Sequence, residues 1–227
     1  MSILPVVTYN DPILREKAAP VEAMDNRVRT LIDDMIETMY HSQGVGLAAP
    51  QIGESLQIFV TNSDPMTEDL DDEQDVGEFV FINPEILSLS GDDIRVEEGC
   101  LSLPTLRDDV TRPDEVHIRY LDRDMNPREL KASGWFSRVI QHEYDHLQGV
   151  LFIDHLSMFK RRLHRSLLRK IDAGNVKMDY PLKPRTETSA EGANAATKTV
   201  ENSHTVANSH TVAKSHTVEN SHTGDAG

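Results

Sequence analysis

The stretch QHEYDHLQG, residues 141–149, constrains this chain more than any other. It contains the pattern HExxH, in which His142 and His146 lie four positions apart and Glu143 stands between them. On an α-helix this spacing points both imidazoles to one side, where they can share a tetrahedral metal ion. Glu143, offset by one residue, can reach a water molecule on that metal and act as general base and then as general acid. Because HExxH also occurs by chance in soluble helices, the third ligand decides the interpretation.

The residues around this pattern predict a buried helix that begins near Ser133. Its polar side chains share one stripe: Arg138, Gln141, Asp145 and Gln148. Apolar side chains cover most of the remaining circumference: Trp135, Phe136, Val139, Ile140, Tyr144 and Leu147. A helix that is apolar around most of its surface packs inside a fold, so both histidines are expected in the interior.

The third metal ligand must come from outside the usual downstream positions. A metzincin would have a third histidine at position 152, where this chain has Phe152. A thermolysin-like enzyme needs a downstream glutamate, but the next one is Glu187. His155 is a nearby candidate. Cys100 is preferred, because it is the only thiol in the chain and a thiolate completes a strong site with an open position.

The remaining pattern predicts a mixed α+β fold. Residues 26–41 have apolar side chains at helical spacing, and Asp25 or Asn26 can cap that helix. Short β-type runs then begin at Leu56, Glu78, Asp93 and Glu115, separated by turn residues. We expect an α+β domain with antiparallel β-sheets packed around a central HExxH helix, and with N- and C-terminal helices.

The end of the chain has a different composition. After about Arg185 it is dominated by Thr, Ser, Ala, Asn and Glu, and a six-residue repeat containing SHT appears. Such a composition cannot bury enough apolar surface to fold. The sequence predicts a catalytic domain at residues 1–175 and a disordered low-complexity tail at residues 176–227.

Charge and hydropathy exclude several classes of partner. The net charge of −15 argues against DNA binding, because phosphate contact needs concentrated Lys and Arg. No run approaches membrane-spanning length, so we expect a cytoplasmic protein without membrane contact. Residues 159–171, FKRRLHRSLLRKI, form one basic exception. That segment is either the solvated face of a terminal helix, anchored in part by Leu163, or a contact to ribosomal RNA.

Three separated motifs resemble those of peptide deformylases, which are recognised by GxGLAAxQ, EGCLS and QHExDHLxG. Here they read GVGLAAPQIG from Gly44, EEGCLSLP from Glu97 and QHEYDHLQG from Gln141. The similarity runs from about Leu4 to about Lys170. It implies a metal-dependent hydrolase that removes the N-formyl group from the N-terminal methionine of newly synthesised polypeptides and releases formate.

The resemblance also implies the catalytic machinery. It makes three residues the ligands of one divalent metal: Cys100, His142 and His146. Fe(II) is the implied native ion, although the same ligands suit Zn, Ni or Co. Glu143 would handle protons, while Gln51 and the backbone N–H of Leu101 would donate to the oxyanion.

Further residues match positions where the family binds its substrate, a nascent N-formylmethionyl polypeptide. They are Val45, Gly46, Val96, Arg107, Trp135 and Val139. Val45 and Gly46 would meet the substrate chain, and Arg107 would bind its backbone. Core packing for the apolar residues and a surface salt bridge for Arg107 are the plain alternatives.

Two other functions compete with deformylation. One is a different metal-dependent amidase that activates water in the same way. The other is a non-catalytic ribosome-associated protein whose metal is structural. Glu143 and Gln51 favour an enzyme, because a purely structural metal site requires neither.

Overall fold

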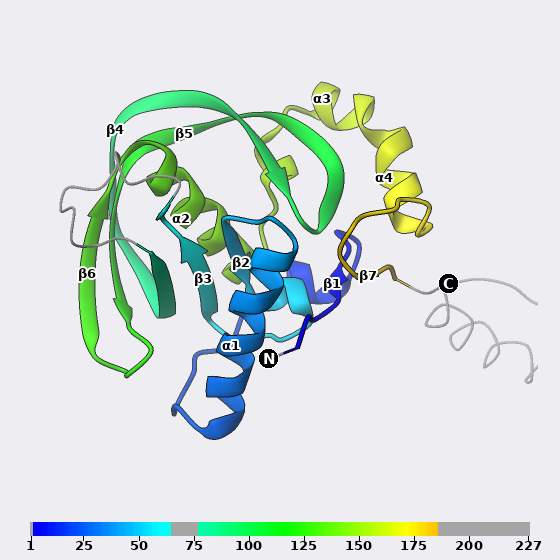
Figure 1. The fold of residues 1–227 in the computed structure, drawn as a ribbon. Coiled ribbons are helices and arrows are strands. Elements are labelled where there is room, and N and C mark those ends of the chain that lie inside the picture. The colour runs from blue at the N-terminus through cyan, green and yellow to red at the C-terminus, as the bar shows by residue number, and fades with distance from the viewer. Residues whose placement is uncertain (1, 65–76, 186–227) are drawn as a thin grey trace, which may run out of the picture. The chain divides into compact units, whose positions relative to one another are not determined.

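The computed structural model describes residues 2–64 and 77–185 (Figure 1). Five strands form an antiparallel sheet in the order β2-β3-β4-β5-β6. They are β2 (Gly46–Ala48), β3 (Ile58–Asn62), β4 (Glu78–Cys100), β5 (Leu103–Leu121) and β6 (Pro127–Ala132). Two further strands, β1 (Val6–Val7) and β7 (Leu182–Lys183), pair in parallel. The fold is α+β, as the sequence predicts.

The helices lie beside this sheet. They are α1 (Asn26–His41), α2 (Gly134–Leu147), α3 (Met158–Leu163) and α4 (Arg165–Asp172), with 3-10 turns η1 (Pro12–Arg15), η2 (Ala49–Ile52) and η4 (Phe152–His155). Asp25 caps α1 by accepting a hydrogen bond of 2.8 Å from the N–H of Val28. Helix α2 contains the HExxH sequence and packs against β2, β3 and β5.

The long β4–β5 hairpin brings distant residues to α2. The runs that the sequence separates at Glu78 and Asp93 belong to one continuous strand, β4. Its pairing with β5 shifts register at four places, and each shift bends and twists the ladder. The hairpin therefore curves across α2 (Figure 1). This curvature brings the last residues of β4 beside the middle of the helix.

Apolar packing holds α2 in place. Phe136, Ile140 and Leu147 on its inner face are completely buried. They join a cluster that includes Phe59 and Phe81, whose rings stack with centroids 4.4 Å apart. Fully burying each such side chain contributes roughly 1.5–3 kcal/mol, so the helix cannot easily shift or rotate.

The C-terminal boundary differs from the sequence prediction. The predicted tail begins at residue 176, but residues 176–185 belong to the fold, because β7 pairs with β1 and Tyr180 is buried. Their partners lie at the other end of the chain, which local composition does not indicate. The tail from residue 186 and the acidic residues 65–76 lie outside the described part of the chain.

The basic segment 159–171 also differs from a single anchored helix. It forms two short helices, α3 and α4, separated at His164. Leu163 is 66% exposed rather than an anchor, whereas Ile171 is buried. Among the described residues, no helix is both long and apolar enough to cross a membrane.

Candidate metal centre

Three side chains meet where the end of β4 touches α2. The thiol of Cys100 and the imidazoles of His142 and His146 place their ligand atoms within 4.8 Å of one another. The Cys100 Sγ atom lies 3.3 Å from Nε2 of His146. One thiolate and two imidazoles form a ligand set suited to a transition metal with an open position, so these residues fit a divalent ion. His155 is not a member of this cluster, because its Nε2 bonds to Asp145 at 2.8 Å.

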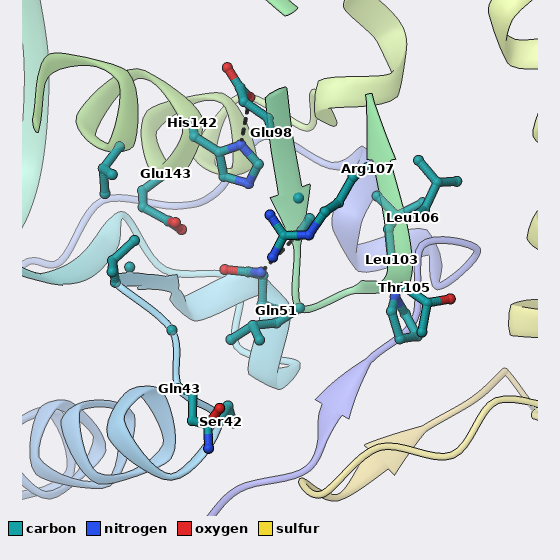
Figure 2. Close-up of a pocket in the computed structure, with 18 of the residues that line it drawn as sticks. Ser42, Gln43, Gln51, Glu98, Leu103, Thr105, Leu106, Arg107, His142 and Glu143 are labelled. Atoms are coloured by element: carbon teal, nitrogen blue, oxygen red, sulfur yellow. Dashed lines mark hydrogen bonds and ion pairs between the residues drawn. The ribbon is translucent and has the colours of Figure 1, made fainter. Parts of the chain in front are cut away.

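Glu98 supports the metal centre from behind, and the sequence prediction missed it. Its Oε2 lies 3.0 Å from Nδ1 of His142, which fixes that ring and leaves Nε2 directed to the ligand cluster (Figure 2). Arg112 and Arg138 also donate to the buried Glu98 carboxylate. Burial raises the pKa of Glu98, but hydrogen bonds from His142 and Arg112 outweigh it and hold the pKa well below its usual range. Strand alternation is the sequence pattern that could have identified Glu98, because residues two apart on a strand, such as Glu98 and Cys100, point to the same side.

The polar stripe of α2 faces the β4–β5 hairpin. Arg138 donates to the carbonyls of Val110 and Ile94, and Gln141 donates to the carbonyl of Pro113. Both residues are at most 5% exposed. The stripe therefore fixes the hairpin against the helix that carries the HExxH sequence.

Glu143 lies against the backbone of the neighbouring strand. A Cβ atom on Gly46 would stand 2.5 Å from Oε1 of Glu143, so only glycine leaves room for this carboxylate. Burial raises the pKa of Glu143 to about 7. Its Oε2 atom is buried and has no hydrogen-bond partner among the described residues.

Gln51 presents its amide N–H₂ group to the metal centre. Its Oε1 accepts a hydrogen bond of 2.8 Å from the N–H of Ala48, and its Nε2 lies 3.4 Å from the Sγ atom of Cys100. The backbone donor thus determines which end of the amide faces the site. Gln51 is 1% exposed, so it is not a surface amide.

Leu101 lies in the tight connection between β4 and β5. Cys100 pairs with Leu103, whereas Gly99 pairs with Arg107, so residues 104–106 bulge out of the ladder. Thr105 within this bulge has a φ of 64°, an uncommon conformation for a non-glycine residue. The carbonyl of Leu101 accepts a hydrogen bond of 2.9 Å from the Tyr180 hydroxyl.

A cavity of about 420 Å³ opens beside these groups. Figure 2 shows His142, Glu143, Gln51 and Arg107 around it. Of the residues expected to bind substrate, five line the cavity: Val45, Gly46, Arg107, Trp135 and Val139. Val96 pairs with Val110 and is not among the lining residues, so its role stays a prediction. Met178 and Tyr180 also line the cavity, although the sequence placed them in the tail.

Comparison with known proteins agrees with this geometry. The family profile described as polypeptide deformylase matches residues 3–162. The chain belongs to the polypeptide deformylase family. It is 46% identical over 186 residues to the peptide deformylase of Salinibacter ruber, an alignment that covers 79% of this chain and 94% of the relative. Peptide deformylase 1 of Rickettsia conorii is 44% identical over 177 residues, with 75% of this chain and 97% of the relative covered.

Solved deformylase structures share the fold. The enzyme from Legionella pneumophila has a TM-score of 0.67 and 41% identity, covering 77% of this chain and 98% of that chain. The enzyme from Ehrlichia chaffeensis in complex with actinonin has a TM-score of 0.67 and 37% identity, covering 78% of this chain and 100% of that chain. As a member of this metal-dependent family, the chain is a hydrolase that removes the N-formyl group from newly synthesised polypeptides.

Proposed function

We propose that this chain deformylates N-formylmethionyl peptides at the site formed by Cys100, His142, His146 and Glu143. The observation that carries this proposal is the grouping of one thiol and two imidazoles within 4.8 Å, with the Glu143 carboxylate in the same cavity. When bound, the ion supplies a Lewis acid that activates water and polarises the formyl carbonyl. The ligand set suits several ions, and the resemblance to the family favours Fe(II) as the native one.

The protein groups around the cavity have separate roles in this proposal. Glu143 takes a proton from the attacking water and passes it to the leaving amine nitrogen as the formyl C–N bond breaks. The products are formate and a free N-terminal amine. Nε2 of Gln51 and the backbone N–H of Leu101 donate to the oxygen that becomes negative in the tetrahedral intermediate.

The cavity walls supply the proposed substrate site. Val45 and Val139 offer apolar surface for the methionine side chain, and Trp135, which is 40% exposed, stands at the rim. The Arg107 side chain is 66% exposed. Its Nη1 atom lies 3.9 Å from Oε1 of Glu97, and such a long, exposed ion pair holds the guanidinium weakly. Its guanidinium is therefore available to bind substrate backbone carbonyls.

A substitution of Glu143 tests the catalytic role. Glu143→Gln preserves size but cannot take a proton, so we expect kcat to fall about 10²- to 10⁴-fold with a formyl-Met peptide. Metal content, measured on anaerobically purified protein, should stay at the wild-type value. Glu37→Gln, the same chemical change at an exposed position of α1 that does not line the cavity, is the matched control. Unchanged deformylation by Glu143→Gln would defeat this mechanism.

We also propose that residues 159–171 contact the ribosome, where the substrate emerges. Helices α3 and α4 combine exposed arginines with exposed Met158, Phe159 and Leu163. Basic side chains suit RNA phosphates, and an exposed apolar patch suits a macromolecular partner. This partner would place the chain in the cytoplasm, a location that cell fractionation can check.

Co-sedimentation tests the ribosome contact. Reversal of Arg161, Arg162, Arg165 and Arg169 to Glu should abolish salt-sensitive binding to ribosomes. The control reverses four exposed arginines elsewhere: Arg27, Arg29, Arg119 and Arg128. Equal binding by the two variants would exclude a specific role for α3 and α4.

A further inference from the structure

Residues 174–185, here called the C-terminal strap, return from α4 to the N-terminal strand. Gly174 has a φ of +67°, and a Cβ atom there would meet Pro184 at 3.1 Å, so the two ends of the strap pack closely. The N–H of Val6 donates to the carbonyl of Pro181 at 2.9 Å, within the β1–β7 pairing. The strap is therefore anchored, and it lies beyond residue 162, where the family profile ends.

The strap places two side chains at the catalytic cavity. Met178 and Tyr180 both line it, and the Tyr180 ring is only 6% exposed. The Tyr180 hydroxyl donates a hydrogen bond of 2.9 Å to the carbonyl of Leu101. A phenol is protonated at neutral pH, so this donor is present under ordinary conditions.

The Tyr180 hydrogen bond is made to the short turn that connects β4 to β5. Leu101 and Ser102 connect Cys100 to Leu103, so their carbonyls need partners outside the strand ladder. The N–H of Tyr9 donates to the Ser102 carbonyl at 2.9 Å, and Tyr180 donates to the Leu101 carbonyl. The turn is thus held from both sides by segments from opposite ends of the chain.

We propose that Tyr180 is a positioning residue for deformylation. Its hydroxyl fixes the Leu101 carbonyl, and because the two peptide planes of a residue share one Cα atom, it also restricts the direction of the Leu101 N–H. This inference rests on the proposed function, in which that N–H donates to the oxyanion. Donors aimed in advance at developing charge stabilise the transition state more than the substrate.

Removal of the hydroxyl tests the proposal. Tyr180→Phe keeps the ring, so we expect kcat for a formyl-Met-Ala-Ser peptide to fall about tenfold, less than the 10²- to 10³-fold typical of deleting a donor. KM and metal content should stay within twofold of wild type. Amide hydrogen exchange in the peptide that contains Leu101 should become faster. Tyr40→Phe, which removes a hydroxyl from a tyrosine that does not line the cavity, is the matched control.

Met178→Ala separates this role from a general effect of the strap. It removes apolar cavity wall but leaves the hydrogen bond, so KM should rise while kcat stays within twofold. A tenfold loss of kcat in Met178→Ala, or wild-type kcat in Tyr180→Phe, would overturn the assignment to the hydroxyl. Failure of metal-loaded wild-type protein to deformylate would instead overturn the proposed function, and this role with it.

Discussion

At the scale of single residues, the site depends on close contacts that leave little room for change. Glu143 occupies the space that any side chain on Gly46 would need. A hydrogen bond from the N–H of Ala48 orients the Gln51 amide, and a hydrogen bond to Glu98 orients the His142 ring. These three groups of the proposed site are thus oriented by neighbours, which removes conformational freedom before a substrate arrives.

Gly46→Ala should displace the Glu143 carboxylate. The added methyl group would lie 2.5 Å from Oε1 of Glu143, a distance that neither atom can tolerate. We expect kcat/KM to fall about 10²-fold, as misplacement of a catalytic group by about 1 Å can cause. A double-mutant cycle measures the coupling: in a Glu143→Gln background, Gly46→Ala should cost little more. Additive losses would contradict this explanation.

Glu98→Gln should weaken both metal binding and the fold. It removes the carboxylate that pairs with the buried guanidinium of Arg138 and one of the two that pair with Arg112, and breaking a buried ion pair typically costs about 3–5 kcal/mol. It also weakens the hold on His142, which should lower metal affinity about 10- to 100-fold. Urea unfolding and chelator competition measure the two effects. The exposed Glu97→Gln variant should match wild type in both measurements.

At the scale of elements, one carboxylate ties the basic helices to the sheet. Asp108 on β5 accepts a hydrogen bond from Lys160 of α3 and lies 2.7 Å from Nε2 of His164. Burial raises the pKa of Asp108, but the hydrogen bonds from Lys160 and His164 outweigh it and lower the pKa to about 2 from its usual 3.8. The proposed ribosome-binding helices are therefore attached directly beside Arg107.

This attachment should contribute stability in a defined pH range. A depressed carboxyl pKa stabilises the fold above about pH 4, and the contribution disappears as the pH falls toward 2. Asp108→Asn should lower Tm by about 2–4 °C at pH 7. The difference from wild type should shrink below pH 4. Asp109→Asn, which removes a more exposed partner of Arg95, should have a smaller effect. A pH-independent difference would show that charge is not the cause.

Local signals in the sequence predicted the elements well. The cap at Asp25, the spacing of α1 and the spacing of His142 and His146 are all contained within single elements, and the structure confirms both helices. Cys100 was preferred as third ligand because downstream positions offered few candidates, and its thiol lies beside both histidines, although its role as a ligand stays a prediction. Glu98 and Tyr180 escaped prediction because their roles depend on strand curvature and on the return of the chain end, which involve residues far apart in sequence.

At the scale of the whole molecule, the catalytic unit extends further than composition indicates. The described residues up to Arg185 form one compact unit. A domain that ended at residue 175 would lack β7 and Tyr180. We therefore place the functional boundary after Arg185.

Two truncations test this boundary. A chain that ends at Arg185 should keep kcat/KM for formyl-Met peptides within twofold of the full-length protein. A chain that ends at Asn175 should lose at least about tenfold, since it lacks the Tyr180 donor. Equal activity of the two truncated proteins would contradict the larger unit.

The β1–β7 pairing sets an order of events during synthesis. Its two strands lie near opposite ends of the described chain, and contacts between such distant segments are slow to form. Because a ribosome makes the N-terminus first, β1 has no pairing partner until almost the entire catalytic unit, up to β7, has been made. The Tyr180 hydroxyl can form its hydrogen bond to the Leu101 carbonyl only after this segment has been made. A nascent copy therefore cannot complete the turn at Leu101 until nearly all of the described chain has left the ribosomal tunnel.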